Sequence, residues 1–265
     1  MIDPAFRTRA GSALASVERE EGVRILLAVE SGSRAWGFPS RDSDYDVRFI
    51  FIWPLAGYLG IAPPCDVIER PLDAELDLGG WDLRKALGLM VRSNAVVLEW
   101  LSSPVVYRSD PAAAAALNDL ARGAAHPPAL AYHYDRLARG AWSPGETDIR
   151  LKSYFYALRP ALCLLWLRDR GTPPPMDLPA LLAGAAIPNA VEDAIQALLP
   201  RKAAAGEADL IPRHPALERF LAAALAFPPP RPAPWDREPA TAAANGLFKA
   251  LALAEQPARP PRAPR

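Results

Sequence analysis

The sequence predicts an α+β fold in which a small domain with a mixed β-sheet is followed by a C-terminal helical bundle. Two runs rich in apolar and β-branched residues, 24–31 and 45–53, predict neighbouring strands. From Asp110 onward the composition becomes helical, with capping residues and prolines between the segments. At 51% hydrophobic and 23% charged residues, the 265-residue chain has an ordinary globular composition. The expected divisions are 1–105 for the sheet domain, 106–227 for the helical domain and 228–265 for a proline-rich, largely disordered tail.

The N-terminal segment predicts an amphipathic helix. Asp3 followed by Pro4 is a helix-start signal, and Gly22 stands where a C-terminal cap is expected. The apolar residues of one face are Phe6, Ala10, Leu14 and Val17. This segment lacks the basic start and apolar core of a signal peptide, and no run reaches the ~18 apolar residues of a membrane span. We therefore expect a cytoplasmic protein with no membrane segment.

The rest of the first domain is expected to alternate strands and turns. Residues 32–38 form a tight connection between the first two strands. Shorter strands are predicted at 65–69 and 74–80, with a turn at Gly79 and Gly80. A helix then begins near Asp82, whose side chain is suited to cap it.

The second half is expected to contain helices and no further strand. Its most apolar helix carries Pro160, which predicts a kink. Prolines dominate the tail, where they remove backbone donors, and only a short helix at 240–255 is expected to interrupt it.

Charge and cysteine content restrict the function. Lysine plus arginine and aspartate plus glutamate number 30 each, so no global basic field attracts nucleic acid, and any such contact requires a local patch. Cys65 and Cys163 are predicted to be buried free thiols. The three histidines show no zinc-like spacing with them.

Two aspartates at the start of the second strand suggest a metal site. Side chains alternate along a strand, so Asp44, Asp46 and Arg48 share one face. Two adjacent carboxylates repel each other unless a cation lies between them or the strand end is open to water. Mg²⁺ suits such a pair because it takes one or two carboxylates plus phosphate oxygens. The alternative is a polar hairpin turn in which the aspartates bond their own backbone. Arg48 could pair with one aspartate or reach a phosphate, and the structural ion pair is the favoured interpretation.

A Gly-Ser turn upstream makes the metal interpretation more specific. Gly32 and Ser33 end the first strand, and glycine lets backbone N–H groups approach a phosphate closely. The serine hydroxyl adds a donor. A Gly-Ser turn followed about ten residues later by Asp-x-Asp at the start of an apolar strand is more specific than either feature alone.

The segment "GSRAWGFPSRDSDYDVRFIF", with "DVIE", "GWDLRKAL" and "KSYFYALRPAL", resembles the nucleotidyltransferase superfamily typified by DNA polymerase beta. It is most similar to the RNA-repair-associated branch, whose members are sometimes found beside RNA ligases. The resemblance covers roughly residues 24–170. It implies a palm-like catalytic domain, two Mg²⁺ or Mn²⁺ ions, and a nucleoside triphosphate such as ATP as the substrate.

The resemblance also implies a third carboxylate. Asp77 is our choice, because its leucine neighbours in the sequence "LDL" point to the opposite face of a strand. Asp66 remains a fallback, Asp82 is better explained as a helix cap, and Asp73 lies in a loop. By this resemblance, Asp44 and Asp46 hold an ion on the triphosphate, and a second ion uses Asp77 as well. Nucleotide contacts are assigned to Gly32, Ser33 and Ser43.

A helix in the second domain offers further nucleotide contacts. Lys152, Tyr156 and Arg159 are spaced by four and three residues and so share a helix face. A cation, an aromatic ring and an arginine suit a triphosphate and a stacked base. The alternative is a solvated stripe in which the long side chains cover the helix surface.

The leading functional hypothesis is Mg²⁺-dependent transfer of a nucleoside monophosphate to a hydroxyl, with an RNA end as the acceptor implied by the resemblance. One alternative is transfer to a protein or small-molecule hydroxyl, as in toxin-antitoxin or antibiotic-modifying relatives. Another is a non-catalytic module that binds nucleotide or RNA. Retention of both Asp44 and Asp46 argues against this last alternative.

Overall fold

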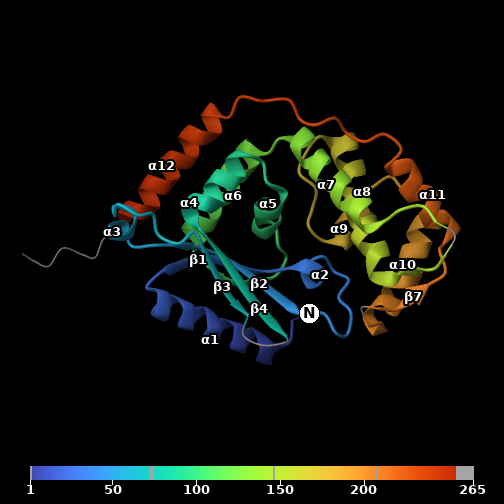
Figure 1. Cartoon of the computed structure of the whole chain (residues 1–265), viewed down its shortest axis with the longest axis horizontal. Coiled ribbons are helices and arrows are strands. Elements are labelled where there is room, and N and C mark those ends of the chain that lie inside the picture. The colour runs from blue at the N-terminus through green and yellow to red at the C-terminus, as the bar shows by residue number, and fades with distance from the viewer. Residues whose placement is uncertain (1, 72–74, 146, 207, 255–265) are drawn as a thin grey trace, which may run out of the picture.

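The computed structural model describes residues 2–71, 75–145, 147–206 and 208–254 (Figure 1). A five-stranded sheet is made of β1 (Arg24–Ser31), β2 (Tyr45–Ile52), β3 (Val67–Pro71), β4 (Leu76–Asp82) and β5 (Val106–Ser109). The helices associated with the sheet are α1 (Pro4–Glu21), α2 (Gly32–Ala35), α3 (Leu55–Tyr58), α4 (Leu83–Val91), α5 (Ala95–Leu101), α6 (Pro111–Ala124) and α12 (Glu238–Ala254). A second group of helices comprises α7 (Pro127–Ala141), α8 (Leu151–Arg170), α9 (Leu178–Gly184), α10 (Asn189–Ala204) and α11 (Pro215–Ala224).

The sheet is mixed, as predicted for an α+β protein. Its strand order is β3-β4-β2-β1-β5, and β2 and β4 are parallel whereas the other neighbours are antiparallel. The parallel register sets Asp46 directly opposite Asp77. Because β1 ends at the Gly-Ser turn beside the start of β2, the turn and both aspartates meet at one end of the sheet.

Helices cover both faces of the sheet. Helix α1 packs on one face, and its Asp3 cap, its apolar stripe and its left-handed Gly22 are as expected from the sequence. Helices α4, α5, α6 and α12 cover the opposite face, and Figure 1 shows α1 on one side of the strands and α4, α6 and α12 on the other. The central strands β1 and β2 are therefore mostly buried, whereas the edge strand β5 is largely exposed.

The Gly79–Gly80 pair does not form the turn that we expected, because both residues lie within β4. A Cβ atom on Gly80 would lie 2.1 Å from Cε2 of Phe49, the residue opposite it on β2. A Cβ atom on Gly79 would lie 3.4 Å from Nη1 of Arg48. Gly80 thus makes room for the Phe49 ring, whereas a Cβ on Gly79 would make only an ordinary contact with Arg48.

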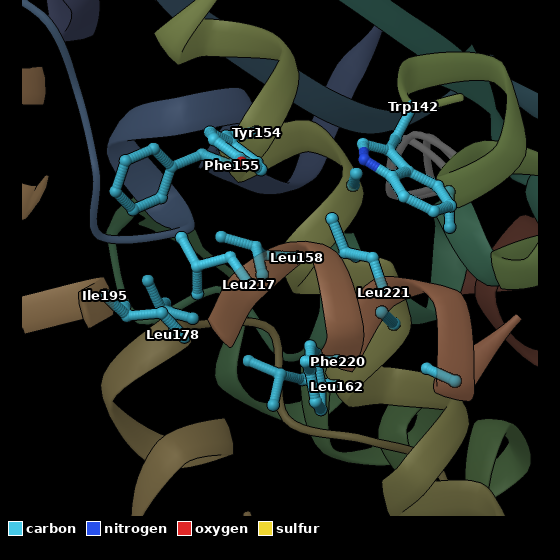
Figure 2. Close-up of a cluster of buried hydrophobic side chains, with 14 of the residues drawn as sticks. Trp142, Tyr154, Phe155, Leu158, Leu162, Leu178, Ile195, Leu217, Phe220 and Leu221 are labelled. Atoms are coloured by element: carbon cyan, nitrogen blue, oxygen red, sulfur yellow. The ribbon is translucent and has the colours of Figure 1, made fainter. Parts of the chain in front are cut away.

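The second group of helices surrounds its own core. Figure 2 shows side chains from α8, α9, α10 and α11 meeting there, including Phe155, Leu162, Leu178, Ile195 and Leu221. The expectation of no further strand was wrong, because β6 (Ile149–Arg150) and β7 (Leu210–Ile211) form a small antiparallel pair. None of the described helices is both long and apolar enough to cross a bilayer.

A short segment after the Gly-Ser turn joins the two cores. Phe38 is 2% exposed and packs in the helical core, with Trp36 against it. The Trp36 Nε1–H donates to Glu99 over 3.3 Å, and Glu99 in turn accepts a bond of 2.8 Å from Arg159 on α8. The main chain of Leu178 also donates to the Trp36 carbonyl, so the turn is fixed between the sheet and the helices.

Both chain segments next to the expected divisions pack on the sheet domain. β5, which starts at Val106, pairs with β1, and α12 packs against α4 and α6. The expected short helix in the tail is therefore present and longer than predicted, whereas residues 255–265 lie outside the described residues. The division at 105/106 stays a prediction.

The two cysteines differ in their surroundings. Cys163 is buried, as expected, but Cys65 is exposed, because it lies in the loop before β3. The expectation of a buried Cys65 was wrong. Its apolar neighbours in the sequence belong to a surface loop.

Candidate active site

The Gly-Ser turn lies against Asp46, the first aspartate within β2. Gly32 has φ +60°, which is a left-handed conformation that favours glycine. A Cβ atom there would lie 2.1 Å from Oδ2 of Asp46, far inside the shortest real contacts. The missing side chain therefore leaves the space into which the Asp46 carboxylate points.

Arg48 joins the carboxylates of two strands. Its Nη2 donates to Oδ1 of Asp46 over 2.9 Å and to Oδ2 of Asp77 over 2.7 Å. Asp46 and Asp77 thus converge on one guanidinium nitrogen, which is the ion pair anticipated for Arg48. Arg48 is 21% exposed, and Asp46 and Asp77 are 33% and 48% exposed, so solvent reaches both carboxylates.

Several charges act on the Asp46 carboxyl group. Burial raises its pKa above the ordinary value, Arg48 opposes that shift, and the neighbouring charges of Asp77 and Asp44 raise the pKa further. Lys152 on α8 lowers it, so this lysine from the helical lobe faces the same site. The three predicted carboxylates and Lys152 are therefore close enough to influence one another.

The loop before β2 is attached to the Gly-Ser turn by serines. Ser43 Oγ lies 3.1 Å from Ser33 Oγ and 2.8 Å from Ser40 Oγ, and it accepts a bond of 2.8 Å from the Ser40 main chain. The Ser43 hydroxyl, predicted to contact nucleotide, is thus engaged within the protein. Its role in this structure is to hold the loop beside Ser33.

Arg34 fixes the position of Asp44 and was missed by the sequence interpretation. Its guanidinium donates to the carbonyl oxygens of Ser43 (2.6 Å) and Asp44 (3.1 Å), and it lies 3.7 Å from the ring centre of Tyr45. A groove of about 620 Å³ opens next to these residues, and Arg9 and Arg41 also line it. The position of Arg34, directly after Gly-Ser, was the only local signal.

Glu30 is a buried carboxyl group directly behind the site, and it too was missed. It is 0% exposed, accepts a bond of 3.0 Å from the Asp46 main-chain N–H, and accepts another from the Tyr107 hydroxyl. Burial raises its pKa to about 7. The sequence did contain a signal for Glu30, since an acidic residue within an otherwise apolar strand is expected to be buried and therefore to need hydrogen-bond partners.

The three residues predicted on one face of α8 have different surroundings. Lys152 lies 5.4 Å from the ring centre of Tyr156, and Tyr156 packs against Trp36 beside the turn. Arg159 is 2% exposed, and its guanidinium bonds Glu99 and the Met176 carbonyl. The nucleotide contact predicted for Arg159 is therefore replaced by a structural role, because the side chain points into the core.

The alternatives for the third carboxylate are engaged elsewhere. Asp82 is 3% exposed, caps α4 through the Arg84 main chain and accepts the Tyr58 hydroxyl. Asp66 pairs with Lys85 over 3.2 Å. Asp73 lies outside the described residues. Of the described candidates, Asp77 is the one that shares a partner with Asp46.

The donor set suits one divalent ion. Within the described ranges, no three His, Cys, Asp or Glu side chains converge into a ready-made metal cluster. Carboxylate oxygens are nevertheless the preferred ligands of Mg²⁺. Arg48 bonds Oδ1 of Asp46, whereas Oδ2 lies toward the Gly32 turn. Asp46 Oδ2 is therefore the oxygen of this carboxylate that Arg48 does not bond, and Asp44 is close enough to act on Asp46 electrostatically.

Comparison with known proteins identifies the family of the chain. The family model RlaP, described as the RNA repair pathway DNA polymerase beta family, matches residues 6–250. The chain belongs to this family. The match extends the resemblance from residues 24–170 to include α1 and most of α12. As a family member, the chain falls within the polymerase beta superfamily of nucleotidyltransferases, as the Gly-Ser and Asp-x-Asp motifs predicted.

A curated relative spans most of the chain. The uncharacterized protein YcgL of Bacillus subtilis (strain 168) is 43% identical over 211 residues, which are 78% of this chain and 81% of that protein. The similarity therefore extends well beyond the Gly-Ser and Asp-x-Asp motifs.

Proposed function

We propose that this family member transfers a nucleoside monophosphate from a nucleoside triphosphate to a hydroxyl at an RNA end, using Mg²⁺ or Mn²⁺. The observation that carries the proposal is the position of the Asp46 carboxylate. It points into the space left by Gly32 at the Gly-Ser turn and lies opposite Asp77 in register. Metal ligands and a phosphate-binding turn thus share one end of the sheet.

Each residue of the site has a proposed task. Asp44 and Asp46 would hold the ion, while the Gly32–Ser33 turn would bind the phosphate chain through its main-chain N–H groups. The groove next to Arg34 would admit the rest of the nucleotide; its lining is mixed in charge, with Arg9, Arg34 and Arg41 beside Asp3, Asp42, Asp44 and Glu75. Lys152 would add positive charge from α8 and Tyr156 an aromatic surface, since Lys152 acts on Asp46 electrostatically.

The proposed reaction is an in-line substitution at the α-phosphorus. The acceptor hydroxyl oxygen forms a bond to phosphorus, the bond to the bridging oxygen of pyrophosphate breaks, and the hydroxyl proton passes to Asp77 or to water. When bound, the divalent ion offsets phosphate charge and lowers the pKa of the attacking hydroxyl. The protein contributes the fixed orientation of both reactants.

An arginine surface supports RNA as the acceptor. Two adjoining cavities of about 510 and 690 Å³ share Arg92 and Arg237, and Arg84 and Arg231 line one each. No aspartate or glutamate lines either cavity among the described residues. Because the net charge of the chain is zero, such a local patch is the feature that RNA binding requires. The family description, which names an RNA repair pathway, supports the same acceptor.

The test incubates the purified protein with each α-labelled nucleoside triphosphate, Mg²⁺ or Mn²⁺, and separate pools of RNA, tRNA and protein. We expect label to appear in an RNA pool. Asp44→Asn, Asp46→Asn and Asp77→Asn should each abolish the transfer, whereas the exposed carboxylate variant Asp119→Asn, on α6, should not. Normal labelling by Asp46→Asn would refute the catalytic assignment.

The same assay separates the alternative functions. Label in the protein pool identifies a protein acceptor, and label in an additional pool of small molecules identifies a small-molecule acceptor; zero net charge is no obstacle to either. Tight nucleotide binding without labelling of any pool identifies a non-catalytic module. Asp66→Asn, compared with Asp77→Asn, tests the choice of the third carboxylate, because Asp66 pairs with Lys85 instead.

A further inference from the structure

Arg48 occupies the position between two proposed metal ligands. Its Nη2 lies 2.9 Å from Asp46 Oδ1 and 2.7 Å from Asp77 Oδ2. A Mg²⁺ ion shared by these oxygens would lie about 2.1 Å from each. One position cannot hold both the guanidinium nitrogen and the ion, and their positive charges repel each other at such distances.

The remaining contacts fix the guanidinium in that position. Nη1 donates to the main-chain carbonyls of Asp77 (3.1 Å) and Val47 (3.2 Å). Gly79, which lies opposite Arg48 on β4, presents no side chain, and a Cβ there would come within 3.4 Å of Nη1. The guanidinium of Arg48 thus makes four hydrogen bonds within the protein, more than an isolated surface ion pair makes.

The two oxygens of Asp46 consequently have different surroundings. Oδ1 is bonded to Arg48, and Oδ2 lies against the Gly32 turn. An ion held by Asp44 and the Oδ2 side does not conflict with the guanidinium contacts. An ion held jointly by Oδ1 and Asp77 does, and it requires Arg48 to move.

We propose that Arg48 is a built-in counter-ion that takes the place of a second metal ion, so that the nucleotide-free protein binds one divalent ion and not two. This inference rests on the proposed function for the identity of the ligands. It makes Arg48 a positioning residue, because it acts through Asp46 and Asp77 and does not itself contact the reacting atoms.

The test counts bound Mn²⁺ in nucleotide-free protein by electron paramagnetic resonance of the unbound ion, with isothermal titration calorimetry as a second measurement. We expect one Mn²⁺ per wild-type chain and two per Arg48→Met chain. Arg48→Met/Asp77→Asn should return to one, because the second ion needs Asp77. Arg122→Met, an exposed arginine of α6 paired with Asp119, should stay at one.

The outcomes separate this inference from the proposed function. Two ions or none in the wild-type chain would overturn it, and this holds even if the Arg48 variant does not fold. One ion in a folded Arg48→Met protein, checked by circular dichroism and repeated with Arg48→Gln, would also overturn it. One ion in the wild type and two in the variant support it whether or not any pool is labelled by nucleotide.

Discussion

Replacing Gly32 by alanine tests how closely the Gly-Ser turn and Asp46 depend on each other. The new Cβ would lie 2.1 Å from Asp46 Oδ2, whereas real contacts of this kind stay beyond 3.0 Å. Either the turn or the carboxylate must therefore move by about 1 Å. Movement of the carboxylate would stretch its 2.9 Å bond to Arg48.

Gly22→Ala is the matched control for backbone strain. Gly22 has φ +69°, close to the +60° of Gly32, but nothing lies within 4 Å of its added Cβ. A left-handed alanine costs about 1–2 kcal/mol at either position. Loss of a charge-assisted hydrogen bond adds about 1.5 kcal/mol at Gly32 alone, and the half-exposed setting of Asp46 keeps that addition at the low end of its range.

Two measurements check this prediction. Urea unfolding should show Gly32→Ala to be less stable than Gly22→Ala by about 1–2 kcal/mol, with an unchanged slope on denaturant. Mn²⁺ affinity should fall at least about tenfold in Gly32→Ala, equivalent to 1.4 kcal/mol, and stay at the wild-type value in Gly22→Ala. Equal stabilities together with equal Mn²⁺ affinities would refute the proposed contact between the turn and Asp46.

Three further predictions address the surroundings of the site. Burial raises the pKa of Glu30 from 4.5 to about 7. The folded state therefore binds this proton more tightly than the unfolded state does. As a result, the unfolding free energy should fall by up to about 3 kcal/mol as pH rises between these two values. Glu30→Gln should flatten that part of the pH profile in urea titrations, and an unchanged slope would count against the buried proton. Arg159→Met should lower the unfolding free energy by about 3–5 kcal/mol, because it leaves Glu99 without its cation. The double variant Arg159→Met/Glu99→Leu should recover much of this loss in thermal melts. A double variant no more stable than Arg159→Met would contradict the ion-pair explanation. Arg92→Ala and Arg237→Ala should each reduce the slope of log affinity for single-stranded RNA against log salt by about 0.7, measured by fluorescence anisotropy, and a slope that does not change would exclude phosphate contacts there.

Local signals in the sequence were sufficient to predict α1 and the side-chain alternation of β2 and β4. The Asp3–Pro4 start and the Gly22 stop bounded α1, and strand alternation correctly separated the Asp46 face of β2 from the buried Phe49 face. The same parity argument selected Asp77, which the register then set opposite Asp46. Each of these predictions depends on the residues within one element.

Features that depend on distant residues were not predictable in this way. Gly79 and Gly80 have the composition of a turn, but both lie within β4, where the absent side chain of Gly80 makes room for Phe49 of the neighbouring strand. Arg159 has the spacing of a residue on the polar face of α8, but its side chain is held in the core by Glu99, which lies 60 positions earlier in the chain.

Glu30 and the strand pair β6–β7 show the same limit. Tyr107, which donates to Glu30, lies 77 positions later, and two-residue strands carry too few side chains to show a period. In both cases the structure depends on which distant residue is the partner, and the secondary-structure propensity of the local sequence does not reveal that partner.

Helix α12 has a consequence for how the chain is made. It supplies Ala244 and Ala252 to the core formed by α4 and α6, with Leu247, Phe248 and Leu251 packed beside them. A ribosome releases α6 roughly 130 residues before α12, which at about 5–20 residues per second is a delay on the order of ten seconds. During that interval the apolar surfaces of α4 and α6 lack their final cover. The nascent chain should therefore be most prone to chaperone capture and aggregation late in translation, when the five-stranded sheet is already complete.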